Sequence, residues 1–242
     1  MIINSYRFAA AGGDLPTPLH WWDLDDLTGG LTDQGSGTST FNLVTQGTPT
    51  VASTSGKNSQ AVIDLDNGDS LFATTSGWDS ATDLLSVSVW FQADSISSSQ
   101  NSLVSWQQSD GQLSQTAINN NSAPFFNVRD AVPTRGQAYD AANTISTGTW
   151  YHLCGTYDGS TVKYYLDGVL QSSATETITL GAFGTASWNF TIGRRAYLSA
   201  NTYHIGKIGA VGIWDAGLTA DEVSTLYGGG TTDGYYADYT FV

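Results

Sequence analysis

The chain has 242 residues, of which 22 are acidic and 8 basic, so its formal charge at pH 7 is −14. That charge excludes a nucleic-acid backbone as partner, because the chain has too few cations to neutralise many phosphates. The single cysteine, Cys154, excludes an internal disulfide framework and a cysteine-rich zinc site. No apolar run reaches the roughly 20 residues of a membrane-spanning helix, and the N-terminus lacks the basic and apolar regions of a Sec-type signal, so we expect neither.

Amino-acid usage favours strands over helices. Only two of the 22 acidic residues are Glu, and Asp, Ser, Thr, Gly and Asn are mixed with Val, Ile and aromatic residues. That mixture suits short strands joined by turns, whereas long helices draw on Glu and Lys. In chain order, the predicted strands are 19–24, 41–51, 61–65, 70–74, 85–92, 102–108, 113–118, 125–129, 150–157, 162–167, 169–175, 188–193 and 204–214. This pattern predicts an all-β sandwich or barrel.

Three regions are expected along the chain. Residues 1–18 are predicted to be an N-terminal arm and linker, because a strand-like run precedes a stretch rich in Ala, Gly and Pro. The globular domain is predicted over residues 19–228. Residues 229–242 begin with a Gly-rich stretch and end in the aromatic run YYADYTFV, which predicts a terminal tail strand.

Local patterns predict how several strands pair. The segment 85–92 alternates apolar and polar residues, which predicts one buried face formed by Leu85, Val87, Val89 and Phe91. Two Asp-Gly pairs, at 158–159 and 167–168, lie between strand-like runs, and glycine accepts the positive φ of a tight hairpin turn. Together the two turns predict a three-stranded antiparallel meander over 150–175.

The C-terminal part predicts a central strand followed by a short helix. The segment 204–214 carries apolar residues on both faces, as expected of a strand covered on both sides. Thr219 and Glu222 form a capping-box pattern, in which each side chain accepts from the other residue's backbone N–H. Gly228 is the predicted end of this helix, giving about two turns.

These motifs resemble a known family. The blocks that carry the resemblance are LDNGD at 65–69, SVSVWF at 86–91, WYHL at 150–153, GTYDG at 155–159, YLDG at 165–168, FTIG at 190–193, GKI at 206–208, IW at 213–214 and LTADE at 218–222. They resemble the laminin G-like, concanavalin A-like jelly-roll group over about 19–228. The resemblance implies a two-sheet antiparallel jelly-roll sandwich that serves glycan or protein adhesion and is non-enzymatic in many members.

Calcium is the one metal that the sequence suggests. The segment 64–69 offers carboxylate and amide oxygens in a turn, and Asp66 and Asp69 are the candidate ligands. The segment fails the EF-hand pattern, because Thr75 stands where Glu is needed, and an ordinary Asn-Gly turn is the alternative. Some members of the family bind calcium at the sandwich rim, but the closing strand here has Gly209 and Ala210 where acidic residues are common.

The enzymatic alternative is glycoside hydrolysis, which needs two carboxyl groups that flank the scissile bond. Related glucanases carry Glu-x-Asp-x-x-Glu on one strand, and this chain has no such motif. The pairs Asp23/Asp25 and Asp64/Asp66 share a strand face, although solvated acids at turns are the preferred interpretation. His152 and Cys154 are expected to be structural, so no catalytic residue is predicted.

Ligand-binding residues stay undefined at this level. Five tryptophans are candidates for a sugar-stacking platform, although most tryptophans in a sandwich belong to its core: Trp21, Trp22, Trp78, Trp106 and Trp188. The segments 119–123 and 130–143, with Arg129, Arg135 and Tyr139, are expected to be rim loops, where recognition often lies.

The resulting hypothesis is a non-enzymatic structural or adhesive virion protein of a tailed bacteriophage, as a capsid decoration or tail component. Release by host lysis would bring an adhesion domain outside the cell without a secretion signal, and the lack of disulfides fits assembly in a reducing cytoplasm. The N-terminus and the 206–228 block also resemble phage surface proteins. Expected partners are other virion proteins or further copies, bound through the terminal segments, and a host-surface glycan. The alternatives are a secreted bacterial lectin or adhesin and a glycoside hydrolase.

Overall fold

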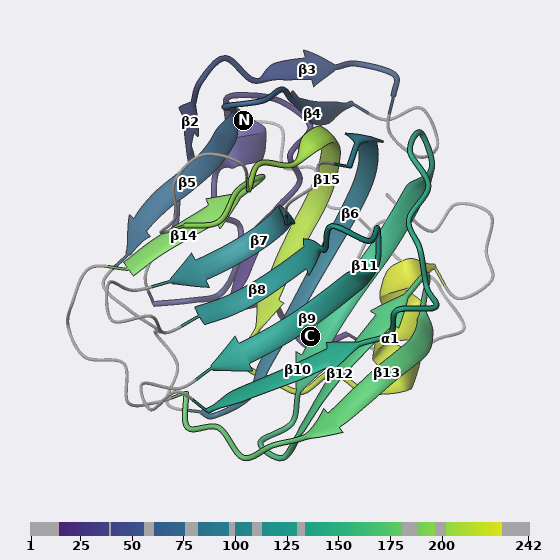
Figure 1. Ribbon diagram of the computed structural model, residues 1–242. Coiled ribbons are helices and arrows are strands. Elements are labelled where there is room, and N and C mark those ends of the chain that lie inside the picture. The colour runs from purple at the N-terminus through teal and green to yellow at the C-terminus, as the bar shows by residue number, and fades with distance from the viewer. Residues whose placement is uncertain are drawn as a thin grey trace.

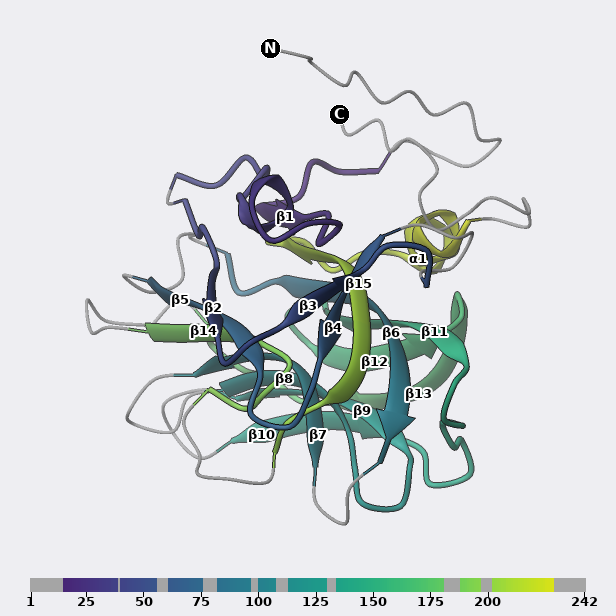
Figure 2. The same ribbon diagram turned by 90° about the horizontal axis from the view of Figure 1, so that it is seen from above.

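The computed structural model describes residues 15–38, 40–55, 61–75, 82–96, 100–107, 113–129, 134–180, 188–196 and 202–228. Within these ranges the chain forms two antiparallel β-sheets packed face to face, with one short helix outside one of them (Figures 1 and 2). The predicted all-β, two-sheet sandwich is therefore confirmed. No helix in the described ranges is both long enough and apolar enough to span a membrane.

One sheet has eight strands in the order β13-β12-β11-β6-β15-β4-β3, and β1 pairs with β15 beside β4. Its strands are β1 His20–Trp22, β3 Thr50–Ala52, β4 Val62–Leu65, β6 Leu85–Ser95, β11 Trp150–Tyr157, β12 Thr161–Leu166, β13 Val169–Thr175 and β15 Ile205–Trp214. The prediction that 204–214 is a central strand is confirmed, because β15 pairs with β6 on one side and with β4 and β1 on the other.

The other sheet has seven strands in the order β10-β9-β8-β7-β14-β5-β2, and it lies in front in Figure 1. Its strands are β2 Val44–Gln46, β5 Ser70–Thr75, β7 Asn101–Gln107, β8 Leu113–Ile118, β9 Pro124–Arg129, β10 Arg135–Tyr139 and β14 Trp188–Ile192. Figure 2 shows this sheet on one side of the sandwich, with β1 and α1 (Ala220–Tyr227) beyond the opposite sheet.

Two sequence predictions need correction. Residues 135–139 are not part of a rim loop but form edge strand β10, which pairs with β9 along its whole length. Its inward residues, Gly136 and Ala138, are too small to give an apolar alternation, so the strand was missed. The predicted single strand 41–51 is two short strands, because the chain turns at Gly47 with a φ of +80° and passes from one sheet to the other.

The core between the sheets follows the predicted period of two. The predicted apolar face of β6 lies in it, formed by Leu85, Val87, Val89 and Phe91. The prediction that only this face is buried is wrong, because Ser86, Ser88 and Trp90 on the other face are also buried. Phe126 of β9 approaches β11 at Gly155, where a Cβ atom would fall inside its ring. A glycine is therefore required at this point for the two sheets to pack.

The predicted meander over 150–175 is confirmed as β11, β12 and β13. In the first turn, Gly159 has a φ of +87° and Asp158 Oδ1 accepts from the backbone N–H groups of Ser160 and Thr161 at 3.1 and 2.8 Å. In the second turn, Asp167 and Gly168 have φ values of +50° and +76°. Two consecutive positive φ values define the hairpin turn that Asp-Gly favours.

The predicted helix is α1. Thr219 and Glu222 form the capping box, and Gly228 ends the helix with a φ of +107°. Residues from α1, from β1, β11, β12 and β15 and from the segments before β1 and α1 form a second apolar cluster on the outer face of the eight-stranded sheet: Leu15, Trp21, Cys154, Tyr165, Ala210, Trp214, Leu218, Val223 and Leu226. This outer face is thus covered by the chain's own apolar side chains.

Candidate functional site

The outer face of the seven-stranded sheet carries polar side chains, in contrast to the apolar outer face of the other sheet. Gln137, Asn127, Gln115, Ser105 and Thr191 are successive register partners across β10, β9, β8, β7 and β14, and we call them the polar row. The neighbours of Asn127, Ser105 and Thr191 along their strands belong to the core, so period-two alternation turns the polar row outward.

Two amide oxygens at this face are buried without a partner. Asn127 in the polar row is 3% exposed and Gln107 at the end of β7 is 4% exposed. Neither Asn127 Oδ1 nor Gln107 Oε1 has a hydrogen-bond partner among the residues described, whereas Gln115 Nε2 donates to Ser102 Oγ at 3.1 Å. An unpaired buried acceptor costs about 1–3 kcal/mol. These two oxygens are therefore poised to accept from a ligand.

The segment after β14 folds back over this face. Thr191 Oγ1 donates to the carbonyl oxygen of Arg194 at 2.8 Å, and the backbone N–H of Ala196 donates to Ser105 Oγ at 3.3 Å. Both hydroxyl groups belong to the polar row. These bonds place Arg194 and Arg195 at the row, beside β14 and β7.

Three arginines, Arg129, Arg135 and Arg195, form a positive group at the same face. Arg129 and Arg135 are register partners on β9 and β10, on the same side as Asn127. Burial lowers the pKa of Arg135 and of Arg195, and the nearby charge of Arg129 lowers both further. The Nε atoms of Arg129 and Arg195 are buried and have no hydrogen-bond partner in the described ranges. The group therefore presents donors as well as charge.

Sequence patterns indicate only part of this site. Arg129 and Arg135 were singled out, but as members of a rim loop, and Asn127, Gln107 and Arg195 were missed. One signal was present in the sequence: four of the five arginines are at positions 129, 135, 194 and 195.

The predicted calcium ligands lie elsewhere, in the turn between β4 and β5. Asp69 Oδ1 accepts from the backbone N–H of Thr48 at 2.8 Å, and Asp69 Oδ2 accepts from that of Asp66 at 3.1 Å. The Asp69 carboxylate thus ties this turn to the turn after β2, and Asp66 is exposed. The ranges described hold no group of three or more His, Cys, Asp or Glu residues arranged to bind a metal. Calcium binding by Asp66 and Asp69 stays a prediction.

One residue of each acidic pair weighed for hydrolysis has a structural partner. Asp23 Oδ1 accepts from Trp21 Nε1 at 2.8 Å, and Asp64 lies 3.8 Å from the Lys207 ammonium group. Burial raises the pKa of Asp25, and the neighbouring carboxylates of Asp23 and Asp26 add to the rise. None of these residues belongs to the strands of the polar row.

Three of the five candidate tryptophans are core residues. Trp21, Trp22 and Trp106 are buried, and Trp22 stacks on Phe190 with ring centroids 5.0 Å apart. Trp78 and the side chain of Trp188 lie outside the described part of the chain.

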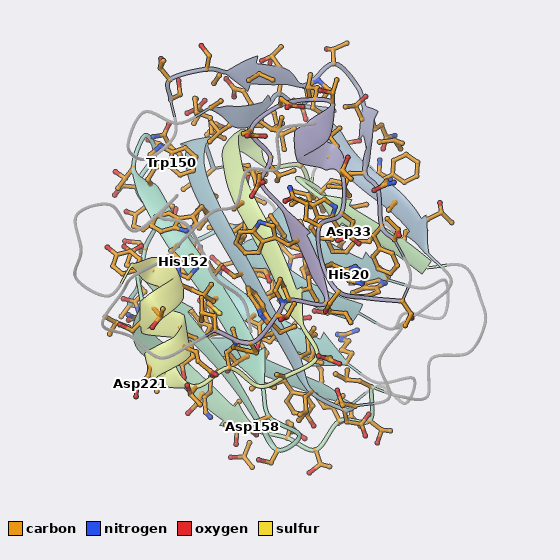
Figure 3. The ribbon with its side chains drawn as sticks, turned by 180° about the vertical axis from the view of Figure 1, so that it is seen from behind. His20, Asp33, Trp150, His152, Asp158 and Asp221 are labelled. Carbon is orange, nitrogen blue, oxygen red and sulfur yellow. The ribbon has the colours of Figure 1, made fainter. Side chains whose placement is uncertain are left out.

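A buried His–Asp pair anchors the segment around β1, as Figure 3 shows from behind. His20 Nδ1 and Asp33 Oδ2 are 2.7 Å apart, and the His20 ring stacks on Phe41 at 3.9 Å. Burial raises the pKa of Asp33, but hydrogen bonds from His20 and from the backbone N–H groups of Phe41 and Gly35 outweigh it and lower the pKa overall. This network joins β1 to residues 33–41.

A serine–histidine pair and the single cysteine are also buried. Ser88 Oγ and His152 Nε2 are 2.8 Å apart, but they are only 4% and 0% exposed. The His152 ring lies against Trp90 and Tyr227, next to α1 in Figure 3. Burial raises the pKa of the Cys154 thiol well above its usual range. All three groups are thus buried within the described part of the chain.

A family model described as the concanavalin A-like lectin/glucanases superfamily matches residues 65–224. The chain therefore belongs to this superfamily, and its two sheets form the jelly-roll sandwich that the resemblance implied. No curated protein sequence matches the chain.

Solved structures with low sequence identity share the fold. Domain 4 of AbnA, a GH43 extracellular arabinanase from Geobacillus stearothermophilus in complex with arabinotriose, is 18% identical with a TM-score of 0.66, and the match covers 88% of this chain and 100% of that one. The receptor-binding domain of botulinum neurotoxin mosaic serotype C/D is 13% identical with a TM-score of 0.66, over 88% and 51% of the two chains. The serotype D ligand-binding domain in complex with N-acetylneuraminic acid is 12% identical with a TM-score of 0.64, over 88% and 51%. The chain thus spans about half the length of these toxin domains.

Proposed function

We propose that this chain is a non-enzymatic glycan-binding domain that holds its ligand on the polar row of the seven-stranded sheet. One observation carries the proposal: the amide oxygens of Asn127 and Gln107 are buried at this face without a partner in the described ranges. Sugar hydroxyl groups both donate and accept hydrogen bonds, so a glycan on this face would satisfy both oxygens. A ligand that completes a hydrogen-bonding site is bound selectively, because analogues without the matching group leave the site unpaired.

The comparisons support carbohydrate as the ligand class. The arabinanase domain is in complex with arabinotriose, and one of the toxin domains is in complex with N-acetylneuraminic acid. Both ligands are sugars, and both proteins share this sandwich fold at low sequence identity.

The chemistry of the face favours binding over hydrolysis. Glycoside hydrolysis uses two carboxyl groups, one on each side of the scissile bond. The polar row, Gln107 and the three arginines of the positive group contain amides, hydroxyls and guanidinium groups, and none of them is a carboxylate. The residues described at this face therefore lack the acid and the base or nucleophile that the reaction needs.

A glycan array with the whole chain tests the proposal, together with the variants Asn127→Leu and Gln171→Leu. Asn127→Leu removes the unpaired amide, and we expect it to abolish binding while the melting temperature stays equal or rises. Gln171, an amide on β13 of the other sheet, is the matched control, and its variant should bind as the wild type does. Absence of binding to every glycan, or full binding by Asn127→Leu, would overturn the proposal. Release of reducing ends from a bound polysaccharide would overturn its non-enzymatic part.

We further propose that the domain is part of a tailed-phage virion, as a capsid decoration or tail component. An adhesion-type sandwich and a chain without disulfide pairing support the proposal. Mass spectrometry of particles purified from lysates that contain this chain should find it in stoichiometric amounts. Its presence only in the particle-free secreted fraction would favour the alternative of a secreted lectin or adhesin.

A further inference from the structure

We infer, on the basis of the proposed function, that the glycan is acidic: its hydroxyl groups meet the polar row, and its carboxylate or sulfate group meets Arg129, Arg135 and Arg195. The inference rests on three properties of the face, namely the distribution of charge over the chain, the partners of the arginines and the kinds of atom left unpaired.

The positive group is opposite in sign to the net charge of the chain. The chain has only 8 basic residues against 22 acidic ones, and three of its five arginines are in this group. A fourth, Arg194, follows the same fold-back and donates from Nη1 to Gln46 Oε1 at 2.7 Å. A net charge of −14 repels anions over most of the surface. A local positive field on one sheet face therefore attracts an anion to that face.

No carboxylate of the described ranges neutralises these arginines. The ion pairs found there join His20 to Asp33, Lys163 to Asp158 and Lys207 to two aspartates. Within the described ranges, the lowered pKa values of Arg135 and Arg195 arise from burial and from the like charge of Arg129. Like charges directly opposite each other on neighbouring strands destabilise a sheet. The arrangement therefore costs stability that an anionic ligand would restore.

The unpaired atoms require two kinds of ligand group, hydrogen-bond donors and hydrogen-bond acceptors. Asn127 Oδ1 and Gln107 Oε1 need donors, and Arg129 Nε and Arg195 Nε need acceptors. A neutral sugar supplies hydroxyl donors but only neutral acceptors. An acidic sugar supplies the same donors together with an oxyanion, whose hydrogen bonds with guanidinium groups are about twice as strong as neutral ones.

The experiment compares matched acidic and neutral glycans on the full chain. The probes are an oligogalacturonate, its methyl ester, a sulfated galactan and the corresponding neutral galactan. We expect the oligogalacturonate or the sulfated galactan to bind at least about tenfold more tightly than its neutral counterpart. Comparing the oligogalacturonate with the sulfated galactan shows whether the site prefers a carboxylate or a sulfate group. The preference should decline between about 0.05 M and 0.5 M salt, because the Debye length shortens.

Variants separate this inference from the proposed function. Arg195→Gln should lower the acidic-to-neutral affinity ratio, because it removes one of the three guanidinium groups assigned to the anion. Lys163→Gln removes the same charge at a cation paired with Asp158 on the other sheet, and it should keep the ratio. Equal affinity of the wild type for acidic and neutral glycans would overturn the inference and leave the proposed function standing. Binding to none of the four probes, with none on the array, would overturn both.

Discussion

Arg129 and Arg135 are directly opposite each other on β9 and β10, and both are on the outer face of the seven-stranded sheet. Neither forms an ion pair within the part of the chain that the structure describes. Two guanidinium groups in this position repel each other, so their placement is explained by a ligand better than by stability.

The variant Arg135→Gln tests whether Arg135 contributes to ligand binding and not to stability. Removing one of two opposed charges should leave the free energy of unfolding unchanged or raise it by a few tenths of a kcal/mol, because Arg135 is largely exposed and its repulsion is screened. Affinity for an acidic glycan should fall in the same variant. Urea denaturation and calorimetric titration measure the two quantities. A marked loss of stability would show that Arg135 has a structural role instead.

Much of the fold is predictable from the sequence because its signals are local. The alternation of Leu85 and Val87 with serines, the Asp-Gly turns and the Thr219 capping box each act within a few residues, and all three are confirmed. Strand β10 was missed because Gly136 and Ala138 bury no large side chain. Its pairing with β9, and not its own apolar pattern, is what defines the strand.

The candidate site was less predictable, for a physical reason. Asn127 and Gln107 have the sequence signature of ordinary outward positions on strands. Both side chains are nevertheless buried, and this burial depends on the surrounding fold, which no local pattern contains. The arginines were visible in the sequence, but only the β9–β10 register places Arg129 opposite Arg135.

Variants in the turn that contains Asp69 distinguish a structural carboxylate from a metal ligand. Asp69→Asn replaces an acceptor by an NH₂ group facing a backbone N–H, which should lower the free energy of unfolding by about 1–3 kcal/mol. Asp66→Asn changes an exposed side chain and should have little effect. Because both Asp69 oxygens already accept backbone bonds, we expect calcium to leave Tm unchanged relative to EDTA. A calcium-dependent rise in Tm that both variants abolish would instead establish the predicted site.

The buried imidazole of His204 should make the free energy of unfolding depend on pH. Burial lowers the pKa of His204 from 6.5 to about 4, and its ring lies edge-on to Phe91. Above pH 6.5 the imidazole is neutral in both the folded and unfolded states, and between 6.5 and 4 only the unfolded state takes up the proton. This group should therefore cost about 2 kcal/mol of stability at about pH 5 compared with neutral pH.

Chemical denaturation of the wild type and of His204→Gln at several pH values checks this expectation. The variant is expected to be less stable at neutral pH, because it disturbs a buried site, but to lose less stability on acidification. Equal losses in the two proteins between pH 7.5 and about pH 5 would contradict the assignment to His204.

Gly155 tests the packing between the sheets. A methyl group at this position would meet the ring of Phe126, so Gly155→Ala should destabilise the domain by about 1–3 kcal/mol. In a Phe126→Leu background the same substitution should cost less, because the smaller side chain leaves room. A double-mutant cycle measured by urea denaturation gives the coupling energy. A coupling energy of zero would mean that the clash is relieved elsewhere.

The most direct test of the glycan-binding account is the ¹H–¹⁵N NMR spectrum of the arginine Nε–H groups during titration with an acidic oligosaccharide. The chain has five arginines, so the spectrum holds few signals, and single Arg→Lys variants assign them. The account predicts that the Nε–H signals of Arg129 and Arg195 shift downfield on binding, as these unpaired donors acquire an oxyanion acceptor. Saturable binding that leaves both signals in place would contradict it.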